Sequence, residues 1–225
     1  MKHGKKYLES LKKYDPAAVL DMLSAAQTVK TIAFAKFDET VELSVKLELK
    51  KSQSVRDTVV LPHQFRGEKK ILVFCKAEKE KEAQDAGAAF TGAEDLIEKV
   101  KGGWLDFDVA VATPDMMKDV GKLGMVLGRK GLMPNPKTGT VTFDLKGAIA
   151  ELRKGRVEFR ADKTGVIHLA VGKVSMDAEK LAENATVVIG EIRRKRPADA
   201  KGDFVRSICL ASTMSPGVWV KDEGV

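Results

Sequence analysis

The chain has 225 residues, of which 44% are hydrophobic, 32% are charged and 6% are aromatic. This composition is typical of a globular protein and too apolar for a disordered chain, and the length suits one large domain or two modest ones. Thirty-nine Lys and Arg face 32 Asp and Glu, a net charge of +7. That excess favours a polyanionic partner, but it is equally compatible with a basic enzyme.

The sequence predicts no membrane span and no secretion signal. Its longest stretch without a charged residue, 207–220, contains a proline and a glycine and is shorter than the ~18 apolar residues that a membrane helix needs. Residues 1–12 are basic, but they lack the apolar core of a signal peptide. We therefore expect a cytoplasmic protein.

The first third of the chain predicts one helix and two strands. Asp15 and Pro16 form a helix start, and apolar residues recur at helical spacing over about 16–34. Apolar and polar residues then alternate over 41–49, which predicts a strand with one buried and one polar face. A second strand is expected over 55–61.

The middle of the chain changes to alternating strands and helices. The apolar run 71–75 is typical of a parallel strand that is buried on both faces. Helices are expected over 78–86 and 93–100, a strand over 107–111, a helix from Thr113 onward and a last helix over 145–152. This rhythm predicts a small parallel α/β sheet.

The last third returns to antiparallel strands. We expect a hairpin of strands 157–160 and 166–171 through a turn at 162–165, a helix over 177–193, and strands over 204–211 and 218–220. The simplest architecture joins both ends of the chain, 1–66 and 158–225, in one discontinuous α+β domain with an antiparallel-type sheet. Residues 67–157 then form an inserted α/β domain.

The sequence offers few catalytic motifs. Gly121–Gly128 has the wrong spacing for a dinucleotide fingerprint, and no nucleophile elbow occurs. We expect no cofactor and no metal at the histidines. One alternative stays open: a nucleotide- or magnesium-binding enzyme that uses Asp106, Asp108 and Asp115, which flank one strand.

Two segments suit RNA binding better. Lys36 and Phe37 place a cation beside a ring, which suits a phosphate and a base, although a core position for Phe37 is as compatible with the pattern. The turn 212–217 carries hydroxyls that can contact phosphates and 2′-hydroxyls. The basic run 193–196 fits either phosphate contact or the C-terminus of a helix.

Six ordered motifs resemble one known family, the L-one family of bacterial ribosomal proteins, which form the large-subunit stalk. The motifs are 35–42 (AKFDETVE), 61–63 (LPH), 112–115 (ATPD), 131–137 (GLMPNPK), 162–165 (DKTG) and 213–214 (TM). They extend over nearly the whole chain. The resemblance implies a discontinuous RNA-binding domain with an inserted Rossmann-like, three-layer α/β domain, and no enzymatic activity.

It also implies partners: large-subunit rRNA at the mobile stalk, the exit-site tRNA whose release the family assists, and the mRNA of the protein's own operon, which the family represses. On this basis we expect a monomer when the protein is not on the ribosome. The positions that match the family's RNA-binding surface are Lys36, Phe37, Thr40, Lys163, Ser207, Thr213, Met214 and Ser215.

The chain departs from the family pattern in three places. Ser215 stands where glycine is common, which raises the question of a positive φ at that position. Gln64 and Phe65 replace a glycine after the LPH motif, and Arg129 replaces a proline.

Overall fold

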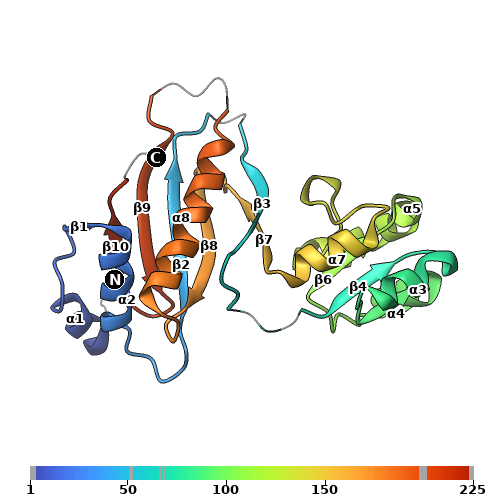
Figure 1. Ribbon diagram of the computed structural model, residues 1–225, viewed down its shortest axis with the longest axis horizontal. Helices are drawn as coiled ribbons and strands as arrows, with labels where there is room; N and C mark the ends of the chain where they lie inside the picture. Colours follow the sequence, from blue (N-terminus) through green and yellow to red (C-terminus); the bar gives the residue numbers. More distant parts are fainter. Residues whose placement is uncertain (1–3, 51–52, 66, 68, 198–201, 223–225) are drawn as a thin grey trace. The chain divides into compact units, whose positions relative to one another are not determined.

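The computed structural model describes residues 4–50, 53–65, 67, 69–197 and 202–222 (Figure 1). The chain divides into two compact units. The discontinuous unit comprises Met1–Phe65 and Val157–Val225, and the inserted unit comprises Arg66–Arg156.

The discontinuous unit is built on a five-stranded sheet. Its order is β1 (Val19–Leu20), β10 (Val218–Val220), β9 (Val205–Ser212), β2 (Thr40–Leu47) and β8 (Val166–Lys173). Neighbouring strands are antiparallel except for β1 and β10, which are parallel. The polar–apolar alternation that predicts β2 is confirmed, since Val41, Leu43, Val45 and Leu47 are all buried.

Two helices cover one face of this sheet: α2 (Met22–Ile32) and α8 (Ala178–Arg194) (Figure 1). Their apolar stripes and the buried side chains of the sheet form one core. The other face bears the polar side chains of β2 and is called the open face below. Cys209 lies on the open face and is partly exposed, whereas Cys75, in the inserted unit, is buried.

The N-terminal part of this unit differs from the prediction. Residues 16–21 are not helical, because Val19 and Leu20 pair with Trp219 and Val220 at the edge of the sheet. A short helix that the sequence does not predict, α1 (Lys5–Leu11), precedes them. It is held to the end of α2 by the buried Ser10, whose Oγ donates to the Ile32 carbonyl at 3.0 Å.

The prediction of a hairpin between 157–160 and 166–171 is wrong. β7 (Arg156–Arg160) pairs with β3 (Arg56–Val60) in a separate two-stranded sheet, and β8 pairs with β2. One bridge, between Ala161 and Ile167, joins the two segments next to the turn. Beyond this bridge the two segments separate, and the side chain of Phe159 on β7 is buried in the main core.

The inserted unit contains a three-stranded parallel sheet in the order β5 (Phe90–Gly92), β4 (Ile71–Phe74) and β6 (Val109–Ala112). All four residues of β4 are buried, as its continuous apolar run predicts. Separate apolar clusters lie on the two faces of this three-stranded sheet. They include residues of α4 (Glu94–Lys101) on one face and of α3 (Ala77–Asp85) and α7 (Leu145–Arg153) on the other. The predicted fold class, α+β with an antiparallel-type sheet together with an inserted three-layer α/β unit, is thereby confirmed.

The helix expected from Thr113 is broken into short pieces. They are the 3-10 turn Pro114–Met116, α5 (Met117–Val120), the 3-10 turn Gly121–Leu123 and α6 (Gly124–Lys130), and a further 3-10 turn, Pro136–Thr138, follows. Glycines at 121 and 124 account for the breaks because glycine is a poor helix former. Gly131 ends α6 with φ +70°, and Arg129 lies in its last turn, where a cation is favoured.

Candidate nucleic-acid interface

The sheet brings together two segments that are far apart in the sequence. Val41 pairs with Ser212, so the start of β2 lies beside the end of β9. The backbone N–H of Thr40 donates to Oγ1 of Thr213 at 3.1 Å, and this Oγ1 lies 3.3 Å from the Thr40 carbonyl, to which it donates. Two of the eight predicted RNA-binding residues are therefore in direct contact.

The buried side chain of Glu39 also joins these two segments. Its side chain is 1% exposed. Oε1 accepts from the N–H groups of Phe34 and Ala35 at 3.1 and 2.8 Å, and Oε2 accepts from Ser212 Oγ at 2.6 Å and the Met214 N–H at 2.9 Å. The loop before β2 and the turn after β9 are thus fixed to one carboxylate.

The environment of Glu39 keeps it ionised. Burial alone raises the pKa of this carboxyl, but the hydrogen bond from Ser212 and those from the backbone oppose it, and together they bring the pKa below its usual value. Sequence reasoning missed this role, since a glutamate beside a strand resembles any solvated carboxylate. We call the Glu39 junction the group formed by Glu39 and the segments 33–40 and 212–215.

The Glu39 junction presents apolar side chains to solvent. Phe37 is 56% exposed and Met214 is 50% exposed, and Lys36 beside them is exposed too. A core position for Phe37, which the sequence left open, is therefore wrong. A ring, a thioether and a cation lie within the two segments that Glu39 holds together, which is a combination suited to bases and phosphates.

A third segment, which contains Lys173 and Ser175, contacts the loop at Asp38. The Asp38 carboxylate accepts from the N–H and Oγ of Ser175 at 3.1 and 2.9 Å. The ammonium of Lys173 donates to the Asp38 carbonyl at 3.3 Å and to Thr40 Oγ1 at 2.9 Å. The loop that carries Lys36 and Phe37 is consequently anchored on both sides.

Ser215 fits its turn without backbone strain. No described residue other than glycine has a positive φ, so Ser215 does not occupy a conformation that requires glycine. Its Oγ accepts from the Ser212 N–H at 3.2 Å and lies 2.7 Å from Ser212 Oγ. The serine therefore adds a hydroxyl link to the Glu39 junction.

The remaining two predicted residues lie at the opposite end of the sheet. Ser207 pairs with Lys46, six residues along β2 from Thr40, or about 20 Å. Lys163 is exposed in the turn 162–165. There the Asp162 carboxylate accepts from the N–H groups of Thr164 and Val166, both at 2.8 Å, and these hydrogen bonds, that of Val166 first, lower its pKa. The structure thus gathers six of the eight residues at one end and two at the other.

The carboxylates of the alternative enzyme hypothesis do not form a site. Asp106 pairs with the ammonium of Lys70 at 2.8 Å, and Asp108 accepts from the Lys70 N–H at 2.9 Å, both before β6. Asp115 follows the other end of β6, a strand of four residues or roughly 13 Å. In the described part of the chain, no three His, Cys, Asp or Glu residues are grouped to hold a metal ion. The three carboxylates of the open alternative are therefore not gathered into one site among the described residues.

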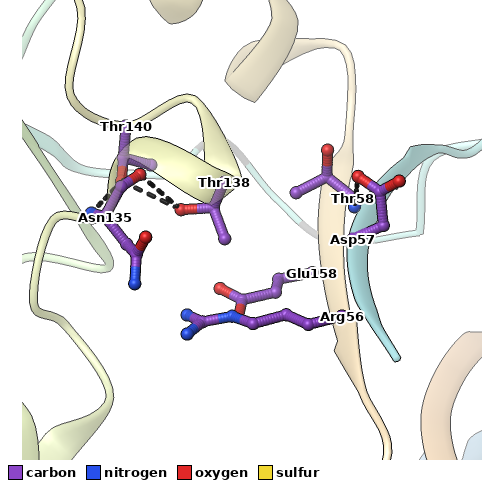
Figure 2. A network of polar contacts seen from close by, with 7 residues as sticks. All are labelled: Arg56, Asp57, Thr58, Asn135, Thr138, Thr140 and Glu158. Atoms are coloured by element: carbon purple, nitrogen blue, oxygen red, sulfur yellow. Dashed lines mark hydrogen bonds and ion pairs between the residues drawn. The ribbon is translucent and has the colours of Figure 1, made fainter. Parts of the chain in front are cut away.

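The GLMPNPK motif of the inserted unit forms a hydrogen-bonded turn. Figure 2 shows the hydroxyls of Thr138 and Thr140 directed toward Asn135, whose carbonyl accepts from them at 3.0 and 3.1 Å. The Asn135 N–H donates back to Thr140 Oγ1 at 2.8 Å. Figure 2 also shows Arg56 and Glu158 of the discontinuous unit, paired at 2.5 Å across β3 and β7. Both groups hold local structure together.

Comparison with known proteins decides the family. The profile of the ribosomal protein L1p/L10e family matches residues 29–216, which is most of the chain. This chain belongs to the L1p/L10e family. The resemblance seen in the sequence is confirmed, and the family is one of RNA-binding ribosomal proteins without enzymatic activity.

Curated relatives extend the match over nearly the full length. The large ribosomal subunit protein uL1 of Treponema denticola is 68% identical over 220 residues, covering 98% of this chain and 97% of the relative. The protein of the same name from Treponema pallidum strain Nichols is 60% identical over 220 residues, with the same coverage. That of Borreliella burgdorferi is 54% identical over 219 residues, covering 97% of each chain. No helix in the described ranges has the length and apolarity to cross a membrane.

Proposed function

We propose that this chain is a component of the large ribosomal subunit whose discontinuous unit binds large-subunit rRNA at the mobile stalk. In the same proposal, the protein assists release of tRNA from the exit site and represses its own operon by binding the mRNA. The family and the names of the relatives support the ribosomal role. The observation that carries the RNA-binding site is the Glu39 junction, because it presents the predicted residues from two distant segments as one surface.

The proposed mechanism is recognition of RNA shape by a preformed surface. The loop and turn of the Glu39 junction are held by bonds to one buried carboxylate, so little conformational entropy is lost when RNA binds. Phe37 and Met214 offer faces for bases or riboses, and Lys36 offers charge for a phosphate. The hydroxyl of Thr213 accepts from the Thr40 N–H and donates to the Thr40 carbonyl. One acceptor lone pair is left, to which a 2′-hydroxyl can donate.

The modest net charge fits this mechanism. Binding that relies on nonspecific phosphate contacts needs many cations, because each neutralised phosphate contributes through counterion release. Here the total excess is only +7 on 225 residues. Affinity from hydrogen bonds and stacking at a fixed surface needs fewer charges.

Sedimentation of ribosomes from cells that make the tagged protein tests the ribosomal role. The protein should remain with large subunits at moderate salt, and its absence from them would refute the proposal. Titration of a stalk rRNA fragment and of the protein's own mRNA leader with the purified chain tests the RNA role. If one surface serves both RNAs, Phe37→Ala should weaken both complexes by a similar factor.

The tRNA role has a separate readout. Large subunits that lack the protein and subunits reconstituted with it are compared for the rate at which deacylated tRNA leaves the exit site. The proposal predicts faster release with the protein present, and equal rates would contradict this part of it.

A further inference from the structure

A row of five side chains crosses the open face of the five-stranded sheet. The strand register places Val19, Trp219, Cys209, Ser44 and His168 side by side on consecutive strands. We call this set the Trp219 row. It lies on the face of the sheet opposite to α2 and α8, because the strand neighbours of Trp219, Val218 and Val220, are buried in the core with those helices.

One end of the Trp219 row is apolar and exposed. Trp219 is 44% exposed and Val19 beside it is 59% exposed, although both belong to regular strands. An indole can bury a large flat area, and aromatic rings on a sheet surface are the stacking platforms of several RNA-binding folds. The other end is polar, since Ser44 Oγ lies 3.0 Å from His168 Nδ1 in a hydrogen bond.

We propose that the Trp219 row is a second RNA contact, on which a nucleobase stacks on the Trp219 indole. This inference rests on the proposed function, that is, on RNA binding by the discontinuous unit. Val19 lies beside Trp219 on the neighbouring strand and enlarges the apolar surface that the base would contact. The Ser44 and His168 pair offers donors and acceptors for a base edge or a ribose hydroxyl.

The row is continuous with the Glu39 junction. β10 begins directly after the turn 212–217, and Trp219 is its second residue. Cys209, the partner of Trp219 in the register, lies on β9 four residues before Thr213, which directly follows the strand, a distance of about 13 Å. A single RNA strand that contacts the turn carrying Met214 would have to extend only about this distance to reach the Trp219 row.

Charge on the open face favours a nucleic acid. Lys46 and Lys173 stand near the two ends of β2, and their ammonium groups donate to neutral oxygens, those of Thr164 and of Asp38 and Thr40 respectively. Neither lysine forms an ion pair among the described residues, so both charges are available to phosphates. Between them β2 contributes one carboxylate to this face, that of Glu42.

Tryptophan fluorescence gives a direct test with the native side chain in place. The chain has two tryptophans. Trp104 packs against Phe90 and Phe107 in the inserted unit, with ring centroids 4.8 and 5.7 Å away, and Trp104→Phe makes Trp219 the sole reporter. A stalk rRNA fragment should quench Trp219 emission along the same titration curve as binding measured by filter retention. An unchanged emission at saturation would overturn the inference.

Affinity measurements separate stacking from charge. Trp219→Thr places a β-branched residue, which suits a strand, at this position and should weaken the fragment complex about fivefold or more, whereas Trp219→Phe should retain most of the affinity. The slope of log K against log salt should not change in either variant, because a stacked base releases no counterions. Lys163→Gln is the contrasting variant, in which the slope should fall.

The outcomes distinguish this inference from the proposed function. If Trp219→Thr binds like the wild type while Phe37→Ala binds weakly, the Trp219 row is not an RNA contact and the proposed function stands. If the wild-type chain itself does not bind the fragment, both fail. If Trp219→Thr dissociates a dimer in sedimentation equilibrium and leaves RNA affinity unchanged, the row is a protein interface and the inference is overturned.

Discussion

The carboxylate of Glu39 and the hydroxyl of Ser212 are 2.6 Å apart, although 173 residues separate them in the sequence. This contact joins the end of β9 to the loop before β2. The exposed side chains of Phe37 and Met214 belong to these two segments. Both partners are buried. The geometry of the candidate RNA surface therefore depends on one ionised group in the interior of the protein.

Replacing Glu39 by Gln should destabilise the discontinuous unit. One of the two oxygens becomes an NH2 group that faces donors, so buried N–H or O–H groups lose their acceptor at a cost of about 2–3 kcal/mol in the free energy of unfolding. Glu42→Gln, on the open face of the strand β2 that follows Glu39, is the matched control and should change the free energy of unfolding by less than about 0.5 kcal/mol. Urea denaturation followed by Trp219 emission in the Trp104→Phe background measures both. Equal effects would contradict the role of Glu39.

The lowered pKa of Glu39 predicts an acid-dependent loss of stability. A carboxyl whose pKa is lower in the folded than in the unfolded state contributes stability above the unfolded pKa, and loses it as the pH falls through the folded value. The unfolded value is about 4.5. Wild type should therefore lose stability below this pH more steeply than Glu39→Gln, and the two curves should converge in acid. Parallel curves from about pH 6 to 3 would show that Glu39 is not stabilised in its ionised form.

Ser215→Ala should cost about 1 kcal/mol of unfolding free energy, because it removes the hydroxyl that bonds the Ser212 backbone N–H. Ser207 lies on β9, the strand before this turn, and its side chain has no described hydrogen bond. Ser207→Ala should therefore change the free energy of unfolding very little. Thermal unfolding of both variants measures the difference. If Ser215→Ala is also neutral, the serine adds nothing to the turn that glycine or alanine lacks.

Asn184 should be among the most sensitive polar residues of the chain. It is fully buried in α8; its Nδ2 donates to the His63 and Val171 carbonyls at 2.9 and 2.8 Å, and its Oδ1 accepts from the His63 N–H at 3.0 Å. Asn184→Leu removes the partner of one buried backbone group, the Val171 carbonyl, and of the two partly buried backbone groups of His63, and we expect a loss of about 3 kcal/mol or more. Thr186→Ala, two residues further on the exposed side of α8, serves as control. A loss below about 1 kcal/mol would contradict this account.

The elements that the sequence predicts well have a strong local pattern. β2 alternates over its whole length, β4 is a continuous apolar run, and α8 carries an apolar stripe through four turns. β1 and β5 have two and three residues, too few for any period to be recognised. The pairing of β7 with β3 depends on residues about 100 positions away, whereas the turn signal at 162–165 favours a local hairpin.

The candidate site was predictable in part. The residue types at Lys36, Phe37 and the 212–217 turn indicate binding chemistry, but their proximity follows only from the register of β2 and β9. The exposure of Phe37 depends on tertiary packing at the end of α2, which helical periodicity does not reveal. Glu39 carried no signal of its own, because its partners Ser212 and Met214 come from the other end of the chain.

The central claim is that the Glu39 junction is the rRNA-binding surface, and a comparison of two phenylalanines tests it most directly. Phe37 and Phe143 are 56% and 57% exposed, and they lie in the discontinuous and the inserted unit respectively. The dissociation constant of a stalk rRNA fragment is measured at one fixed salt concentration for the wild type, Phe37→Ala and Phe143→Ala. We predict that Phe37→Ala loses about 1–3 kcal/mol of binding free energy and that Phe143→Ala binds like the wild type. Unchanged binding by Phe37→Ala, or an equal loss in both variants, would contradict the account.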